Sequence, residues 1–142
     1  DLRSYRTNRW KLAFDSSNTD GSSSTVLTRN RKATILMELV VQAADVSHMM
    51  QHWEVYSRWN ERLYKEMYVA YHQGRLEKDP TESWYQAEIH FFDEYIIPLA
   101  RCLKESGLFG ASCDELLRYA MSNRNEWKQN GKKLVTGYHE NI

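Results

Sequence analysis

The spacing of the apolar residues constrains this chain more than any other feature of its sequence. From about residue 31 to residue 127, apolar side chains recur at every third or fourth position in four successive runs. This spacing places them along one face of an α-helix, whereas a half-buried strand would alternate at every second residue. The chain has only two prolines and six glycines, the residues that most often interrupt helices. The sequence therefore predicts an all-α fold, a helical bundle.

The four runs give approximate bounds for the predicted helices. We expect these helices to cover about 31–45, 52–73, 81–106 and 112–127. The buried face of the second helix is predicted to consist of Trp53, Tyr56, Trp59, Leu63, Met67 and Tyr71. Pro98 falls inside the third helix and is expected to bend it or to leave a carbonyl group unpaired, because proline has no amide hydrogen.

The remaining segments divide the chain. Residues 1–14 are predicted to form a short amphipathic helix. The Ser-rich stretch 15–25 is predicted to be a flexible loop, because small polar side chains bury too little surface to offset the entropy of ordering. We therefore expect an N-terminal connecting segment at 1–32, a helical domain at 33–130 and a polar, frayed tail at 131–142.

The composition argues against several classes of protein. Lysine plus arginine and aspartate plus glutamate are equal at 19 each, so that no net charge favours nucleic acid or an anionic membrane surface. No apolar run approaches the roughly 20 residues that a bilayer span needs. Cys102 and Cys113 are too few for a disulfide framework and lack the spacing of a metal site. We expect reduced thiols and a cytoplasmic protein.

Asp45 stands at the end of the first predicted helix. A carboxylate at such a junction is typical of a residue that ends or caps a helix. His48 and His52 are four residues apart, a spacing that can present two imidazoles to zinc with Asp45 as a third ligand. The glutamate that follows the first histidine of a metalloprotease helix is absent, which favours surface or capping histidines over a zinc site.

Glu88 is the only charged residue on the apolar stripe of the third predicted helix. An unpaired carboxylate is costly to bury, so this side chain must reach the rim of the core or have a partner. Phe91 follows one helical turn later on the same face. A carboxylate beside an exposed aromatic ring suits a planar ligand that forms hydrogen bonds, and a paired structural glutamate is the alternative.

Four motifs resemble those of a known enzyme family and occur in the same order. Their segments are 44–47, 53–62, 88–99 and 125–127. The first is similar to an Ala-Asp-(Leu/Ile/Val)-Ser segment, the second to the helix after it, and the last to a closing Arg-Glu-Trp. The third is similar to a Gln-x-x-Phe-(Ile/Phe)-Asp-x-(Ile/Tyr)-x-x-Pro-Leu helix. Together they resemble the C-terminal half of the catalytic domain of the class I 3′,5′-cyclic nucleotide phosphodiesterases.

The resemblance implies an all-helical metallohydrolase of the HD type. In this family zinc and a second divalent ion, usually magnesium, activate a hydroxide that hydrolyses cAMP or cGMP to the 5′-monophosphate. By position, Asp45 is implied to be a metal ligand and Glu88 replaces a glutamine that reads the purine. Phe91 and Leu63 take the places of the apolar residues that clamp the purine, and His48 that of a pocket asparagine. The implied partners are a cyclic nucleotide and fused signalling domains.

The chain also departs from the pattern of the family. The His-Asn-x-x-His segment and the His-Asp pair, which supply two histidines, an aspartate and a proton-donating histidine, do not occur. One carboxylate cannot hold two metal ions, so we expect a catalytically inactive fragment with a partial catalytic domain at 33–130. The alternative is a non-catalytic helical binding or regulatory module derived from that domain. The parent protein could be attached to a membrane through a fused domain.

Glu88 also permits a prediction about the substrate. A glutamine amide both donates and accepts hydrogen bonds, whereas an ionised carboxylate only accepts them. Such a carboxylate can accept from N1–H and the 2-amino group of guanine, but it would face the N1 lone pair of adenine. An ionised Glu88 therefore favours cyclic GMP, and a protonated Glu88 would reverse that preference.

Overall fold

The computed structural model describes residue 8 and residues 22–142. Every regular element in this part of the chain is helical, which confirms the predicted all-α fold. The chain divides into two compact units, Asp1–Asp45 and Val46–Ile142. The helix predicted at 1–14 lies outside the described residues except at position 8, as does the predicted loop up to residue 21. None of the described helices combines the length and apolar character needed to cross a membrane.

The first unit contains α2, Ser22–Asp45. The apolar spacing predicts one buried stripe of Ile35, Leu36, Leu39, Val40 and Ala43 on this helix. Ile35, Leu39 and Ala43 are buried at intervals of four residues, whereas Val40 is 38% exposed, so the stripe is confirmed in part. The predicted start near residue 31 is wrong, because the Ser-rich stretch is already helical from Ser22 onward. Once a helix is nucleated, each further residue adds one hydrogen bond, and serine and threonine reduce helix stability only modestly. The helix therefore extends into the Ser-rich stretch although the composition there is typical of a loop.

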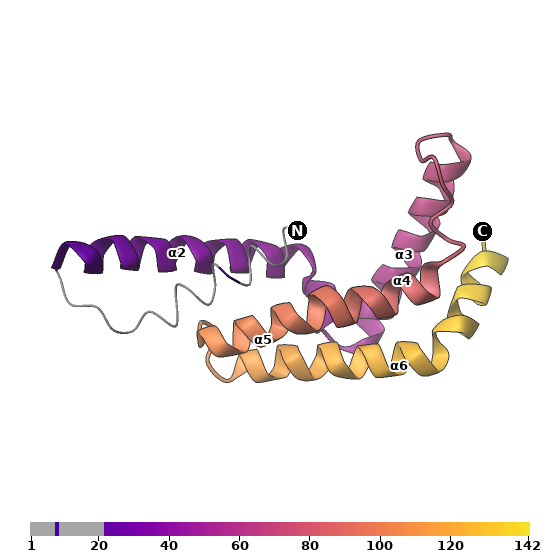
Figure 1. Ribbon diagram of the computed structural model, residues 1–142. Helices are drawn as coiled ribbons and strands as arrows, with labels where there is room; N and C mark the ends of the chain where they lie inside the picture. The colour runs from indigo at the N-terminus through magenta and orange to yellow at the C-terminus, as the bar shows by residue number, and fades with distance from the viewer. Residues whose placement is uncertain (1–7, 9–21) are drawn as a thin grey trace. The chain divides into compact units, whose positions relative to one another are not determined.

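The second unit consists of six consecutive elements. They are the 3₁₀-helix η1 (Ser47–Met50), α3 (Trp53–His72), α4 (Trp84–Phe91), the π-helix η2 (Phe92–Ile96), α5 (Ile97–Ser106) and α6 (Ser112–Glu140). The long helix α6 packs against each of the others, and α5 lies alongside it (Figure 1). The core of the unit is therefore arranged around α6.

Three aromatic rings from different elements meet in this core. Tyr56 of α3 packs edge-on against Phe92 of η2 and Trp127 of α6, with ring centroids 5.3 and 6.0 Å apart. All three side chains are fully buried. Edge-to-face contacts of this kind add to the stabilisation that burial of the rings supplies. Trp127 also donates from Nε1 to the carbonyl oxygen of Tyr85 over 3.1 Å, which ties α6 to α4.

The buried face of α3 differs from the predicted one. Tyr56 and Asn60 are buried one helical turn apart, whereas Trp59 and Leu63 are 50% and 38% exposed. The prediction followed apolar character alone. Asn60 can be buried because its amide oxygen accepts a hydrogen bond from Trp84 Nε1 over 3.1 Å, and buried polar groups are tolerated when they are paired.

The third predicted helix is three consecutive helical elements, because Pro98 cannot continue an α-helix. The proline lacks an amide hydrogen, and its ring would collide with the carbonyl group four residues earlier. Here the π-helix forms hydrogen bonds between residues five apart, so that Ile97 N–H donates to Phe92 O. Helix α5 then begins with Pro98 in its first turn. The first turn of a helix needs no donor within the helix. The π-helix thus accommodates the proline.

The prediction of a frayed tail after residue 130 is wrong. Helix α6 continues to Glu140, and Gly131 and Tyr138 within it are buried. Tyr138 packs against Tyr64 with ring centroids 5.6 Å apart, and its hydroxyl donates to Ser57 O over 3.4 Å. Packing on α3 orders a segment whose composition is mostly polar. The boundaries 1–32, 33–130 and 131–142 stay predictions, and the observed division into units falls after Asp45.

Two glycines of α6 have opposite surroundings. A Cβ atom at Gly131 would lie 2.8 Å from two ring atoms of Trp127 and 2.9 Å from Tyr85 Cδ2, whereas one at Gly137 would meet nothing within 4 Å. Gly131→Ala is therefore expected to lower the free energy of unfolding by about 1–3 kcal/mol. Gly137→Ala, the matched control, should leave it unchanged or raise it by up to about 1 kcal/mol. Urea unfolding followed by circular dichroism measures both, and equal stabilities would contradict this packing.

Candidate functional site

Glu88 lies where α4 faces α3, and it has a hydrogen-bonding partner there. The hydroxyl group of Tyr56 donates to Glu88 Oε2 over 2.8 Å. Tyr56 is fully buried, and the carboxyl group of Glu88 is partly buried. Of the two possibilities that the sequence left open, the rim of the core or a partner, the structure shows a partner. Tyr56 itself was predicted only as a core residue, and its role as the partner of Glu88 was missed.

The hydrogen bond belongs to a chain of side chains between α3 and α4. Trp84 Nε1 donates to Asn60 Oδ1 over 3.1 Å, and Asn60 Nδ2 donates to Tyr56 Oη over 3.5 Å. Tyr56 and Asn60 are one turn apart on α3, and Trp84 and Glu88 are one turn apart on α4. Because the oxygen of Tyr56 accepts from Asn60, its hydrogen is committed to Glu88. A polar residue one turn from a tyrosine within an aromatic run was the available sequence signal.

Burial raises the pKa of Glu88 to about 7, although the hydrogen bond from Tyr56 opposes the rise. Burial and the neighbouring carboxyl group raise the pKa of Tyr56 far above its ordinary value. Burial also raises the pKa of Tyr138 of α6, and the nearby carboxyl groups of Glu61 and Glu88 add to the rise. Both phenols therefore keep their protons while Glu88 changes between its neutral and ionised forms near neutral pH.

The raised pKa of Glu88 predicts a pH-dependent stability. In the unfolded chain this residue ionises with a pKa near 4.5, whereas in the folded chain its pKa is about 7. The folded state binds more protons between these values, so this residue lowers the free energy of unfolding as pH rises, by an amount on the order of 3 kcal/mol. Glu88→Gln should therefore raise Tm at pH 8 and leave it nearly unchanged at pH 4.

The matched control for this measurement is Glu82→Gln, which removes an exposed carboxylate just before α4. Thermal unfolding of the three proteins at both pH values gives the comparison. An equal shift for the two variants at pH 8 would show that burial of Glu88 does not oppose its ionisation.

The two predicted purine-clamp residues are both partly exposed. Leu63 on α3 and Phe91 at the end of α4 are 38% and 37% exposed, so each offers apolar surface to a ligand. The ring of Phe91 is stacked on that of Tyr95, with centroids 5.1 Å apart and planes 6° from parallel. No hydrogen bond or ring contact within the described part of the chain joins Leu63 or Phe91 directly to Glu88.

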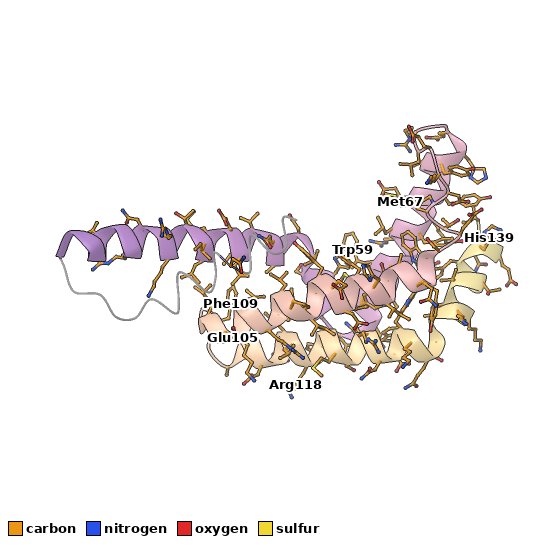
Figure 2. All side chains as sticks on the ribbon, viewed as in Figure 1. Trp59, Met67, Glu105, Phe109, Arg118 and His139 are labelled. Carbon is orange, nitrogen blue, oxygen red and sulfur yellow. The ribbon has the colours of Figure 1, made fainter. Side chains whose placement is uncertain are left out.

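His48 lies in η1 and is close to an exposed aromatic residue of α3. The rings of His48 and Trp59 have centroids 6.0 Å apart, and the guanidinium group of Arg62 lies over Trp59 at 5.4 Å. Figure 2 shows Trp59 on α3. Burial lowers the pKa of His48, so its imidazole is neutral at neutral pH. The role of His48 in place of a pocket asparagine stays a prediction.

The described residues do not form a metal site. Asp45 is the exposed last residue of α2 and belongs to the first unit. His52 is the N-cap of α3, where its Nδ1 accepts from Glu54 N–H over 3.4 Å. Among the residues that the structure describes, no group of three or more His, Cys, Asp or Glu side chains could hold a metal ion. The role of Asp45 as a metal ligand therefore stays a prediction.

A groove was also missed by the sequence analysis. It has a volume of about 450 Å³ and lies between α3 and α6. Its walls include Trp53 and Glu61 of α3 and Lys133 and Tyr138 of α6. None of the predicted site residues lines this groove.

A sequence model described as 3′5′-cyclic nucleotide phosphodiesterase matches residues 1–107. The chain belongs to this phosphodiesterase family. The match covers most of the chain, includes all five predicted site residues and ends before α6, so the resemblance inferred from the motifs is confirmed at the level of the family. Comparisons with curated proteins and with solved structures found no match.

Proposed function

We propose that this chain supplies the purine-binding part of an enzyme that hydrolyses cAMP, cGMP or both to the 5′-monophosphate in cytoplasmic signalling. Membership of the phosphodiesterase family supports the reaction class. The observation that carries the proposal is the hydrogen bond from Tyr56 to Glu88, which holds a carboxyl group of near-neutral pKa one turn from a partly exposed Phe91.

Each predicted residue has a role in this proposal. Glu88 forms hydrogen bonds with the edge of the base, while Phe91 and Leu63 supply apolar surface for its faces. His48 adds a neutral hydrogen-bonding group beside the pocket. Asp45 contributes one oxygen ligand to a divalent cation, zinc or magnesium in the family.

The protonation state of Glu88 determines which hydrogen bonds its carboxyl group offers to a base. When Glu88 is ionised, both carboxylate oxygens only accept, which matches N1–H and the 2-amino group of guanine. When Glu88 is protonated, its hydroxyl can donate to N1 of adenine while its carbonyl oxygen accepts from the 6-amino group. The neutral acid can equally donate to O6 of guanine and accept from N1–H. We therefore propose that the ionised form favours cGMP and that the neutral form serves both nucleotides, in place of the reversed preference that the sequence analysis predicted.

This proposal predicts how substrate preference changes with pH. With a pKa of about 7 for Glu88, the neutral fraction falls about tenfold from pH 6 to pH 8. The ratio of kcat/KM for cAMP to that for cGMP, measured on the intact enzyme, should fall by up to the same factor. Any group that titrates equally for the two substrates cancels in this ratio.

The decisive comparison uses Glu88→Gln, whose amide does not titrate. For this variant, the ratio of kcat/KM for cAMP to that for cGMP should be independent of pH. Glu82→Gln, the exposed control, should retain the pH dependence of the unaltered enzyme. If Glu88→Gln leaves the ratio and its pH profile unchanged, Glu88 does not read the base.

A second prediction separates binding from catalysis. The 142 residues alone are expected to bind cyclic nucleotides without hydrolysing them, because one carboxylate cannot hold two metal ions. Calorimetry with cGMP and chromatographic detection of GMP, each with and without added Zn²⁺ and Mg²⁺, measure the two properties. Hydrolysis by these 142 residues would contradict the prediction.

A rival function follows from the sequence, in which the His-Asn-x-x-His segment and the His-Asp pair of the family do not occur. A non-catalytic regulatory module would bind the nucleotide in the same pocket. Assays of the intact parent protein distinguish the two: hydrolysis there supports the enzyme, and binding without hydrolysis at saturating metal supports the module.

A further inference from the structure

The stacked rings of Phe91 and Tyr95 are the most nearly parallel aromatic pair in the described part of the chain. Their planes differ by 6° and their centroids lie 5.1 Å apart. The other stacked pair among the described residues, Tyr85 and Trp127, differs by 25° at 6.4 Å. Phe91 is the more exposed member of its pair, and Tyr95 is half-buried behind it.

The π-helix η2 places the two rings together. Phe91 ends α4, and Tyr95 lies within the π-helical segment Phe92–Ile96 that follows it. In an α-helix, residues four apart are offset by about 40° around the axis. The wider i→i+5 turn brings the later residue more nearly into line with the earlier one, which favours parallel stacking. The segment that accommodates Pro98 therefore also aligns these rings.

Phe91 would otherwise have little to restrain it. A partly exposed phenylalanine at a helix end can change rotamer, and a ligand that stacks on it must then restrict that motion on binding. The ring of Tyr95 restricts it in advance. Offset parallel stacking is also a favoured arrangement of aromatic pairs, so the contact is attractive and not merely steric.

We infer that Tyr95 is a positioning residue, whose ring backs Phe91 and holds it parallel to the plane of a bound purine. The inference rests on the proposed function, since it assigns Tyr95 to the same base-binding site. Tyr95 acts through Phe91 and does not itself touch the nucleotide. Because every purine has a flat face, the contribution should be equal for cAMP and cGMP, in contrast to that of Glu88.

The test compares Tyr95→Leu and Tyr95→Phe in the 142-residue chain, with cGMP and cAMP titrated by calorimetry. Tyr95→Leu should weaken binding of both nucleotides by about three- to tenfold, and Tyr95→Phe should restore it because the stacked ring is kept. The control Phe109→Leu, which removes an exposed ring at the turn between α5 and α6 (Figure 2), should bind as the unaltered chain does.

Two further measurements separate positioning from a general loss of structure. In the intact enzyme, Tyr95→Leu should raise KM for both nucleotides with kcat unchanged, as expected when ground state and transition state lose the same contact. The preference between cAMP and cGMP, and its pH profile, should stay the same. If Tyr95→Leu does not fold, Tyr95→Met, which keeps the length of the side chain without a ring, should show the same loss.

Several outcomes would overturn the inference. Unchanged affinity in Tyr95→Leu, or equal loss in Tyr95→Phe and Tyr95→Leu, would show that the stacked ring does not position Phe91. A loss confined to one nucleotide would show that Tyr95 reads the base edge. Absence of any binding by the unaltered chain would overturn the proposed function and this inference together, whereas normal binding with no effect of Tyr95 overturns the inference alone.

Discussion

The hydrogen bond from Tyr56 to Glu88 links the core of the second unit to its candidate site. The ring of Tyr56 packs against Phe92 and Trp127 in the centre of the core, while its hydroxyl group donates to Glu88 over 2.8 Å. Packing therefore fixes the donor, and the donor orients the carboxyl group. Because the oxygen of Tyr56 also accepts from Asn60, the direction of the donation is set as well. The site is precise because its supporting residue is a core residue.

A second constraint comes from Pro98. A proline in the middle of an α-helix removes a backbone hydrogen bond and normally kinks the helix. This chain widens one turn instead, and the widened turn contributes Phe92 to the core and aligns Tyr95 with Phe91. Single π-helical turns inside α-helices occur frequently at functional sites. One local requirement thus serves the packing of the core and, in the proposed function, the binding of the base.

The periodicity of the sequence predicted the helical class and the approximate positions of the helices, because amphipathic spacing is a local property. It did not predict which face of α3 is buried, since Asn60 is buried only because Trp84 pairs with it. It also ended α6 too early, because Tyr138 is ordered by packing on α3. Its hydroxyl group donates to the carbonyl oxygen of Ser57, which lies 81 residues earlier in the sequence. The site residues came from family motifs. The hydrogen bond between Tyr56 and Glu88 depends on non-local geometry that no local pattern contains.

The carboxyl group at position 88 is the less stable of two closely related choices. A glutamine there could also accept the hydrogen bond from Tyr56, and it would carry no cost of ionisation in a buried place. What the carboxyl group adds is a charge that appears near neutral pH, because burial raises its pKa to about 7. Such a charge changes which hydrogen bonds the side chain can form, and a neutral amide cannot reproduce this change. The loss of stability and the proposed protonation-dependent specificity would thus have one physical cause, the burial of an acid beside a fixed donor.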